Sequence, residues 1–355
     1  MSTHKVPESE RFKGSAKYVE YLCARILVSM LQRLPIRCAY SLGRCVGWLA
    51  WKTMKRRRDT VRKNLEIVNA WMDERAGGGD LRREVAEHQT SNVEHRTSQL
   101  EKKLQAPGLK FHPSAAVSDL NSQSASLGDL EAQVKEVFQR GGANLFSGFS
   151  FARISPEQTE KYLSTAGLEQ LKAALAAGKG AIILLAHMGP WEALSQLPGL
   201  AQKHGIEASF GAMYRPLNNH YLDEWFKAER EGQGTRLFSR RDGFHKPVDF
   251  LRSGGMLGIL SDQKMREGPK VPYFGVVAPT SPVAGLFQRR SGAAVLAVSV
   301  ETLGRAKWKI SVHPVEWPEV LAPKDRETPA RVCNAAVEQA VARSPLDAFW
   351  LHKRF

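Results

Sequence analysis

The residue types best suited to proton transfer are His187 and Glu192, five positions apart in the segment AIILLAHMGPWE. The short apolar run 181–186 follows the breaker Gly-Lys-Gly and predicts a buried parallel strand. His187 comes directly after this run, at the strand end where open α/β sheets place reacting groups. Gly189 and Pro190 predict a turn, with a helix from Trp191 onward.

Across a strand–turn–helix corner the two side chains are able to meet, whereas residues five apart on one helix lie about 140° apart. We expect the Glu192 carboxylate to fix the imidazole tautomer of His187. The other ring nitrogen would then take a proton from a hydroxyl. Backbone amides at the Gly189 turn are candidate donors to a developing oxyanion. The alternative is a structural histidine that is satisfied by hydrogen bonds.

Length, composition and charge restrict the class of protein. With 355 residues the chain can bury one large core or two modest ones, and its apolar content of 43% is ordinary. The formal net charge of +15 is not ordinary, because such a surface attracts nucleic acid, anionic lipid headgroups or an acidic carrier protein. The four cysteines and ten histidines show no metal-ligand spacing, and no dinucleotide fingerprint or nucleophile elbow occurs. The sequence therefore predicts neither a metal nor a cofactor.

The N-terminal region has the composition of helices that lie in a membrane interface. Residues 18–34 and 36–51 are apolar but carry arginines, and neither has the uncharged length of a clear transmembrane helix. The residues expected to contact an anionic membrane are Trp48, Trp51, Lys55, Arg56, Arg57 and Arg58. One alternative is a soluble helical hairpin packed on the main domain. Another is a nucleic-acid patch, but no nucleic-acid-binding motif accompanies the charge, so we expect no nucleic-acid partner.

The order of segments predicts an α/β catalytic domain behind this helical region. We expect a tail at 1–17, membrane-interface helices at 18–72, a polar, partly helical or mobile insertion at 73–130, and the catalytic domain at 131–355. In that domain, strands alternate with helices, which indicates a mostly parallel central sheet flanked by helices. The predicted strands are 181–186, 208–214, 235–238, 256–260, 294–300 and 307–312, and the predicted helices are 129–138, 165–177, 191–204, 219–231, 244–253, 281–291 and 328–343.

Several short blocks carry a family resemblance. They are HMGPWE at 187–192, MYRPLNN at 213–219, GILSDQ at 258–263, VPYFG at 271–275, APTSP at 278–282 and the ending FWLHKRF at 349–355. In this order they resemble the bacterial lipid A biosynthesis acyltransferase family, within the glycerolipid and lysophospholipid acyltransferase superfamily. The resemblance covers about 18–70 and 131–355 and skips the insertion. Pro190, where the family usually has Asn, and SPLDAFW, where Pro-Glu-Gln-aromatic is more usual, depart from the pattern.

The resemblance implies that His187 is the general base and Glu192 its partner. It also implies that Arg215, Asp262 and Gln263 line the same site and bind substrate. The pattern of elements agrees in part, because Arg215 and Asp262 each follow a predicted strand. An ion pair that organises the site is the alternative role for these two side chains.

The expected activity is a membrane-associated O-acyltransferase at the cytoplasmic face of the bacterial inner membrane. A hydroxyl of a lipid or glycolipid acceptor, such as a lipid A precursor, would attack an acyl thioester carried by acyl carrier protein or CoA. No cofactor beyond this co-substrate is expected. The alternatives are an acyltransferase acting on another lipid and a non-catalytic protein that binds anionic lipid.

Overall fold

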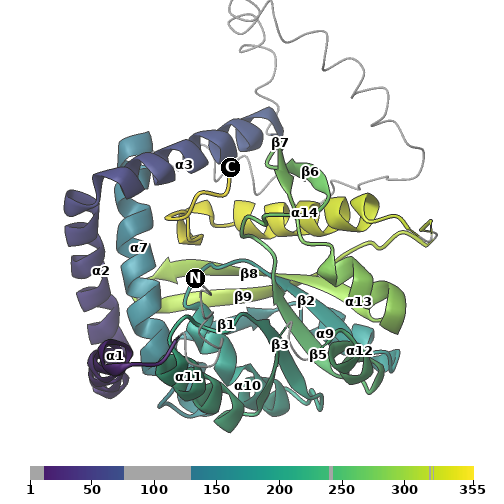
Figure 1. Ribbon diagram of the computed structural model, residues 1–355, viewed down its shortest axis with the longest axis horizontal. Coiled ribbons are helices and arrows are strands. Elements are labelled where there is room, and N and C mark those ends of the chain that lie inside the picture. The colour runs from purple at the N-terminus through teal and green to yellow at the C-terminus, as the bar shows by residue number, and fades with distance from the viewer. Residues whose placement is uncertain (1–11, 76–128, 240–242, 320, 323) are drawn as a thin grey trace, which may run out of the picture.

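The centre of the molecule is a seven-stranded sheet (Figure 1). The computed structural model describes residues 12–75, 129–239, 243–319, 321–322 and 324–355. Its strands are β1 (Leu163–Ala166), β2 (Ala181–Leu185), β3 (Phe210–Tyr214), β4 (Thr235–Ser239), β5 (Met256–Leu260), β6 (Lys270–Tyr273), β7 (Val276–Pro279), β8 (Ala294–Gly304) and β9 (Lys307–Pro314). The strand order in the sheet is β1-β9-β8-β2-β5-β3-β4, and β6 and β7 form a separate hairpin.

Most neighbouring strands of the sheet run parallel. β2 pairs in parallel with β5 and β8, β3 with β4 and β5, and β1 with β9, whereas β8 and β9 are antiparallel. The apolar sequence AIILL lets β2 lie in the middle of the sheet with layers on both faces. As a result, the carboxyl ends of β2, β3, β4 and β5 meet at one edge.

Helices flank the sheet, with α14 above it and α9 and α10 below it in Figure 1. The α-helices are α1 (Ser15–Arg33), α2 (Ile36–Thr53), α3 (Lys55–Arg75), α7 (Leu130–Phe151), α8 (Pro156–Thr159), α9 (Leu168–Ala176), α10 (Leu197–Lys203), α11 (His220–Gly232), α12 (His245–Arg252), α13 (Val283–Ser291) and α14 (Glu327–Ala342). Two 3-10 helices, η1 (Trp191–Gln196) and η3 (Pro345–Asp347), lie close to the carboxyl edge of the sheet. The fold class expected from the sequence is therefore confirmed.

Glycines allow α2 and α7 to pack closely. A Cβ atom at Gly43 would collide with the carbonyl of Gly142, and one at Gly47 would collide with the carbonyl of Phe138. The four-residue spacing places Gly43 and Gly47 on one face of α2. This face is buried against α7, so α2 packs directly on that helix.

Two segments differ from the expected elements. The helix expected at 129–138 continues to Phe151, and the helix expected at 165–177 is preceded by β1 and begins at Leu168. Gly167 separates β1 from α9 with φ of 75°, and a Cβ there would collide with the carbonyl of Val312. A left-handed residue in such close contact ends the strand and starts the helix, which the apolar periodicity did not reveal.

The expected tail and insertion lie mostly outside the described residues. Helix α3 continues to Arg75, three residues beyond the expected boundary, and α7 begins at Leu130. Residues 76–128 of the expected insertion, and 1–11 of the tail, are not among the described residues.

Candidate active site

The register of the parallel strands brings His187 to Asp262. Leu185 at the end of β2 pairs with Leu260 at the end of β5, and the Ser261 N–H donates to the Leu185 carbonyl at 2.9 Å. His187 lies two positions after Leu185, and Asp262 lies two positions after Leu260. The two side chains therefore leave adjacent strands at the same level of the sheet edge.

Both carboxylate oxygens of Asp262 contact His187. Oδ1 lies 2.7 Å from the imidazole Nδ1, and Oδ2 accepts the His187 backbone N–H at 3.0 Å. Because a carboxylate only accepts, Nδ1 carries the proton and Nε2 of the neutral ring is left as an acceptor. The amide nitrogen of the exposed Gln263 side chain lies 3.4 Å from Nε2. This is the arrangement of a general base with an orienting acid.

Electrostatics keep Asp262 ionised although it is only 6% exposed. Burial would raise the pKa of this carboxyl, but the hydrogen bonds from the His187 side chain and backbone outweigh burial and hold the pKa below its ordinary value of 3.8. The charge is therefore present to stabilise an imidazolium on His187.

Glu192 does not hold the imidazole, in contrast to the expectation from the HMGPWE spacing. Its two carboxylate oxygens accept from Arg230 Nη2 at 3.1 and 2.8 Å. The chain after Pro190 forms the 3-10 helix η1, which places Glu192 beside α7 and α11: a Cβ at Gly148 of α7 would approach its Cβ to 3.0 Å. The expected His187–Glu192 contact is thus replaced by a His187–Asp262 contact.

The amides of the Gly189 turn are already engaged. The Gly189 N–H donates to the Asp347 carbonyl at 3.1 Å, and the Trp191 N–H donates to the Gly189 carbonyl at 2.9 Å. Gly189 itself is required, because its φ is +59° and a Cβ would collide with Val300. In this structure the Gly189 N–H is therefore not available to an oxyanion, and its expected role stays a prediction.

Arg215 reaches the same sheet edge without joining the His187–Asp262 pair. It follows β3 directly, and β3 lies next to β5 with Ala212 opposite Gly258. Its side chain is exposed and makes no hydrogen bond or ion pair with any described residue. The structure thus shows no Arg215–Asp262 ion pair and leaves the Arg215 guanidinium exposed at the sheet edge.

The C-terminal segment contacts the site, a role that the sequence analysis did not assign to it. The Phe349 N–H donates to the His187 carbonyl at 2.7 Å, so the segment around Phe349 holds the turn that carries His187. The rings of His187 and Trp191 are 5.8 Å apart and those of Trp191 and Phe349 are 5.6 Å apart. The aromatic ending FWLHKRF was the available signal for this role.

A buried polar cluster lies next to this segment. Arg354 is 0% exposed, and its guanidinium carbon lies 4.4 Å from the centroid of the Tyr273 ring. None of its three side-chain nitrogens has a hydrogen-bond partner among the described residues. Burial lowers the pKa of His352 and of Arg354, and the charge of Asp262 opposes both shifts. The Arg354 guanidinium therefore contributes positive potential near Asp262, whereas burial favours the neutral form of His352.

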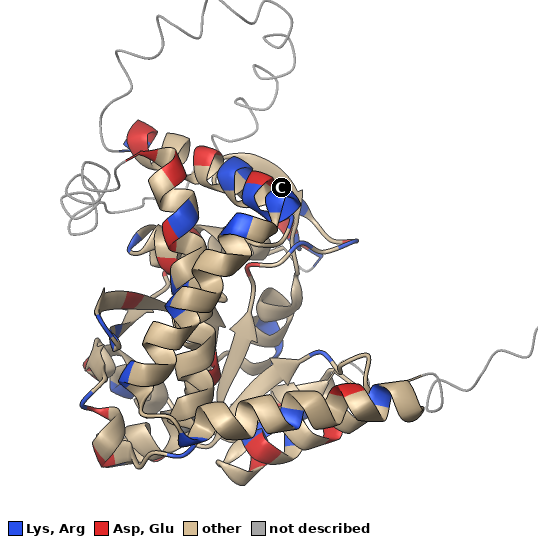
Figure 2. Ribbon diagram, turned by 90° about the vertical axis from the view of Figure 1, so that its left-hand side faces the viewer, with Lys and Arg blue, Asp and Glu red and all other residues tan. Residues whose placement is uncertain are grey.

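Figure 2 shows basic positions gathered at the start of α3 beside a largely uncharged α2, the region of the predicted membrane contacts. Trp48 is 38% exposed, and Lys52 lies 4.0 Å from its ring centroid. Trp51 is half-buried, with Arg58 and Lys135 near its ring. Lys55, Arg56 and Arg57 are exposed, although Arg57 also donates to the Leu351 carbonyl at 2.8 Å.

The outer faces of α1 and α2 are apolar. Val19 and Ile26 of α1 are 57% and 61% exposed, and Leu49 of α2 is 55% exposed. Among the described helices, none is long and apolar enough to cross a membrane. The surface of α1 and α2 is thus an exposed apolar face bordered by cations, without a spanning helix.

Comparison with known proteins places this site in a family context. A profile of the family described as bacterial lipid A biosynthesis acyltransferase matches residues 128–355. The lipid A biosynthesis palmitoleoyltransferase of Escherichia coli (strain K12) is 28% identical over 204 residues, which are 56% of this chain and 63% of that protein. The match therefore spans less than two thirds of that relative.

Two further relatives differ in extent and in the acceptor that their names imply. The lipid A biosynthesis lauroyltransferase of Escherichia coli (strain K12) is 23% identical over 332 residues, 92% of this chain and 88% of that protein. The phosphatidylinositol mannoside acyltransferase of Mycobacterium tuberculosis (strain CDC 1551 / Oshkosh) is 30% identical over 155 residues, 42% of this chain and 46% of that protein.

Proposed function

Because the chain belongs to the bacterial lipid A biosynthesis acyltransferase family, we propose that it is a membrane-associated O-acyltransferase with His187 as its general base. The observation that carries the proposal is the contact of 2.7 Å between His187 Nδ1 and Asp262 Oδ1 at the carboxyl edge of the sheet. It leaves Nε2 as the acceptor for a proton, at a position where open α/β sheets bind ligands.

In the proposed reaction, an acceptor hydroxyl gives its proton to His187 Nε2 as its oxygen attacks the carbonyl carbon of an acyl thioester. The imidazolium is stabilised by the Asp262 carboxylate, which remains ionised. The tetrahedral intermediate then collapses: the C–S bond breaks, and the proton on Nε2 passes to the leaving thiolate. An ester and a free thiol are formed, with no acyl-enzyme step.

The oxyanion of the tetrahedral intermediate needs a donor, and we assign this role to the Gln263 side-chain amide. It is exposed and its nitrogen lies 3.4 Å from His187 Nε2, whereas the Gly189 amide is engaged by Asp347. Side-chain amides serve as oxyanion donors, and removal of one costs about 10²–10³-fold in kcat. Gln263→Ala should therefore lower kcat on this scale, and an unchanged kcat would remove Gln263 from the mechanism.

Glu192 and Arg215 lie at the edge of the proposed site. Glu192 remains a proposed participant, now as half of the Glu192–Arg230 pair and not as the partner of the imidazole. Arg215 follows β3 with an exposed guanidinium, which suits a phosphate on either substrate. The donor would be acyl carrier protein or CoA; the net charge of +15 supports an acidic carrier.

Membrane association is proposed from the apolar face of α1 and α2, on the cytoplasmic side of the inner membrane. Exposed side chains such as Ile26 and Leu49 would enter the interface, while Lys55 and Arg56 at the start of α3 would contact anionic headgroups. A peripheral position of this kind would bring the sheet edge to a lipid acceptor. Lipid A precursors are the favoured acceptors because the palmitoleoyl and lauroyl relatives are lipid A enzymes by name.

The test is acyl transfer by the purified protein in mixed micelles. Lauroyl thioesters of acyl carrier protein and of CoA would each be offered with a lipid A precursor, and in parallel with phosphatidylinositol mannoside. Ester formation on the lipid A precursor supports the proposal, and preference between the thioesters identifies the donor. Transfer only to the mannoside would correct the acceptor, and release of free fatty acid without ester would contradict the function.

A further inference from the structure

The C-terminal segment 347–349 runs antiparallel to the catalytic turn 187–189. Three backbone contacts join them: the Gly189 N–H donates to the Asp347 carbonyl at 3.1 Å, Met188 and Ala348 form an antiparallel bridge, and the Phe349 N–H donates to the His187 carbonyl at 2.7 Å. The backbone that carries His187 is therefore held by residues about 160 positions later in the chain. Whatever fixes this segment also fixes the turn.

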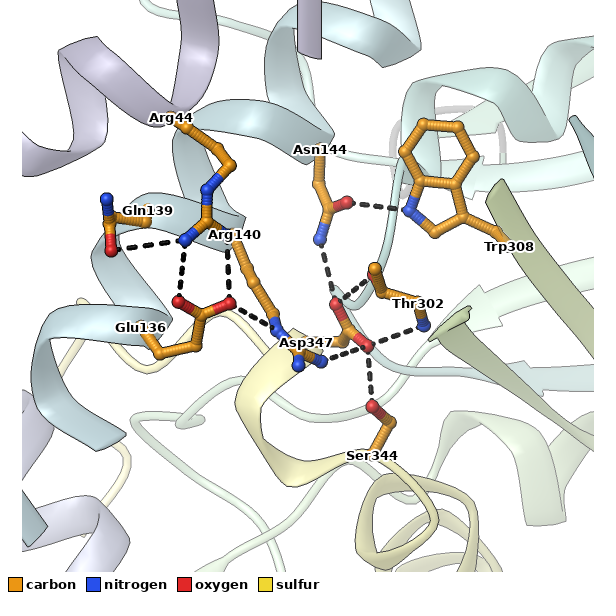
Figure 3. A network of polar contacts seen from close by, with 9 residues as sticks. All are labelled: Arg44, Glu136, Gln139, Arg140, Asn144, Thr302, Trp308, Ser344 and Asp347. Atoms are coloured by element: carbon orange, nitrogen blue, oxygen red, sulfur yellow. Dashed lines mark hydrogen bonds and ion pairs between the residues drawn. The ribbon is translucent and has the colours of Figure 1, made fainter. Parts of the chain in front are cut away.

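The Asp347 carboxylate fixes the segment (Figure 3). It accepts from Ser344 Oγ at 2.5 Å, from the Thr302 N–H at 2.8 Å and Oγ1 at 2.5 Å, from Arg140 Nη1 at 3.1 Å and from Asn144 Nδ2 at 3.2 Å. The donors come from α7, from β8 and from the turn before η3. Asp347 is 3% exposed, so little water competes for these bonds.

Two of the side chains that donate to Asp347, Arg140 and Asn144, make further hydrogen bonds. Arg140 Nε also donates to Glu136 at 2.9 Å, and Glu136 accepts two hydrogen bonds of 2.9 Å from Arg44 of α2. Asn144 accepts from the indole N–H of Trp308 in β9 at 2.9 Å. Asp347 thus lies at the centre of a hydrogen-bond network that extends from α2 to the sheet.

We propose that Asp347 is a positioning residue for His187, acting through the backbone pairing of 347–349 with 187–189. Asp262 approaches His187 from β5, whereas the Asp347 network approaches the same turn from α7 and β8. The distance of 2.7 Å between His187 Nδ1 and Asp262 Oδ1 therefore depends on the position of β5 and on the position of the turn 187–189. Val300 packs against Gly189 and lies two residues before Thr302 on β8. The packing of Val300 and the hydrogen bonds from Thr302 to Asp347 therefore restrain the same turn. The inference rests on the proposed role of His187 as general base.

Asp347→Asn is the appropriate change because it keeps the shape of the side chain. One carboxylate oxygen becomes an NH₂ group, which would face N–H or O–H donors of its present partners. Asn334→Ala is the matched control. Asn334 is buried and donates to the Pro272 carbonyl at 2.7 Å and to Thr280 Oγ1 at 3.0 Å, but these contacts hold the β6–β7 hairpin. Both variants lose stability, and only the first disturbs the catalytic turn.

The experiment measures kcat, KM for the acyl thioester and the downfield proton resonance of the His187–Asp262 hydrogen bond, below the melting temperature of each variant. For Asp347→Asn we expect kcat to fall about 10–100-fold, because misplacement of a reacting group by about 1 Å has this scale. KM should change less than threefold, and the resonance should shift or disappear. Asn334→Ala should keep both the wild-type resonance and a kcat within about twofold.

Two outcomes overturn the inference. A wild-type resonance in Asp347→Asn shows that Asp347 does not act on His187, whatever its effect on melting. Equal losses of kcat in both variants show a general effect of stability. The resonance does not depend on turnover, so it separates failure of this inference from failure of the proposed function. If Asp347→Asn does not fold, Thr302→Val removes one donor to Asp347, and an unshifted resonance there is contradictory too.

Discussion

The most informative single change is Asp262→Asn, because Asp262 makes the contact with His187 that the motif spacing predicts for Glu192. The carboxylate accepts two hydrogen bonds from His187, one from Nδ1–H and one from the backbone N–H. An amide of the same shape offers one acceptor oxygen and one NH₂ donor. If the oxygen keeps the backbone contact, the NH₂ group faces Nδ1 and favours the tautomer with the proton on Nε2. That tautomer is unable to accept a proton from the hydroxyl.

The expected loss is large. When the aspartate that orients a catalytic histidine in Ser-His-Asp enzymes is replaced by asparagine, kcat falls about 10⁴-fold. The same logic here predicts a fall of about 10³–10⁴-fold, which corresponds to about 4–5.5 kcal/mol of barrier at about 1.36 kcal/mol per factor of ten. KM for either substrate should change little, because Asp262 is buried behind the imidazole.

Glu192→Gln is the matched control, since it makes the same chemical change at the other carboxylate. The glutamine oxygen still accepts from Arg230, so only charge assistance of that pair is lost. We expect a loss of about tenfold, the scale of one hydrogen bond to a charged group. The assay is the initial rate of acyl ester formation at saturating thioester and acceptor, with folding checked by circular dichroism. A larger loss in Glu192→Gln than in Asp262→Asn would show that Glu192, and not Asp262, supports His187 in the reaction.

Four other changes test further parts of the structure. Burial raises the pKa of Glu338 from 4.5 to about 7, so the wild type loses stability as the pH rises between these values. In thermal melts, Glu338→Gln should be more stable than wild type by about 3 kcal/mol at pH 8 and equally stable near pH 4. Gly189→Ala should lower both melting temperature and kcat, with a cost of roughly 2–4 kcal/mol from positive φ and the Val300 contact. Replacing Arg56 and Arg58 by Gln should weaken sedimentation with anionic vesicles by about 1 kcal/mol per charge at low salt, whereas Lys179→Gln, at the amino end of β2, should not. Exchanging 76–128 for a short Gly/Ser linker should leave the melting temperature and the rate on a simple hydroxylated acceptor near wild type, as its polar composition predicts.

The elements of the sheet could be predicted where each strand forms a distinct apolar run. The strand 256–260 is found with the expected bounds, and those of β3, β4, β8 and β9 lie within a few residues of the expected ones. The hairpin β6–β7 was missed because its strands are only four residues long and β6 contains Pro272. It is held instead by α14, through Asn334 and Glu338.

The residues of the candidate site could be predicted from the sequence, but the contacts between them could not. His187, Arg215 and Asp262 all follow strands, and the parallel sheet brings them to one edge. Which carboxylate meets the imidazole depends on β2 lying next to β5 with Leu185 opposite Leu260, a long-range pairing that local spacing does not encode. The role of the C-terminal segment depends likewise on contacts between residues far apart in sequence.

Proton transfer by His187 in an acyl transfer reaction is tested by the rate of ester formation by wild type and by His187→Ala. Lauroyl acyl carrier protein and a lipid A precursor in mixed micelles are the substrates, and matched circular dichroism and melting show that the variant is folded. The wild type should form the ester, and the variant should be slower by at least about 10²–10⁴-fold, the range of general-base catalysis. Ester formation by folded His187→Ala within tenfold of wild type would show that His187 is not the general base.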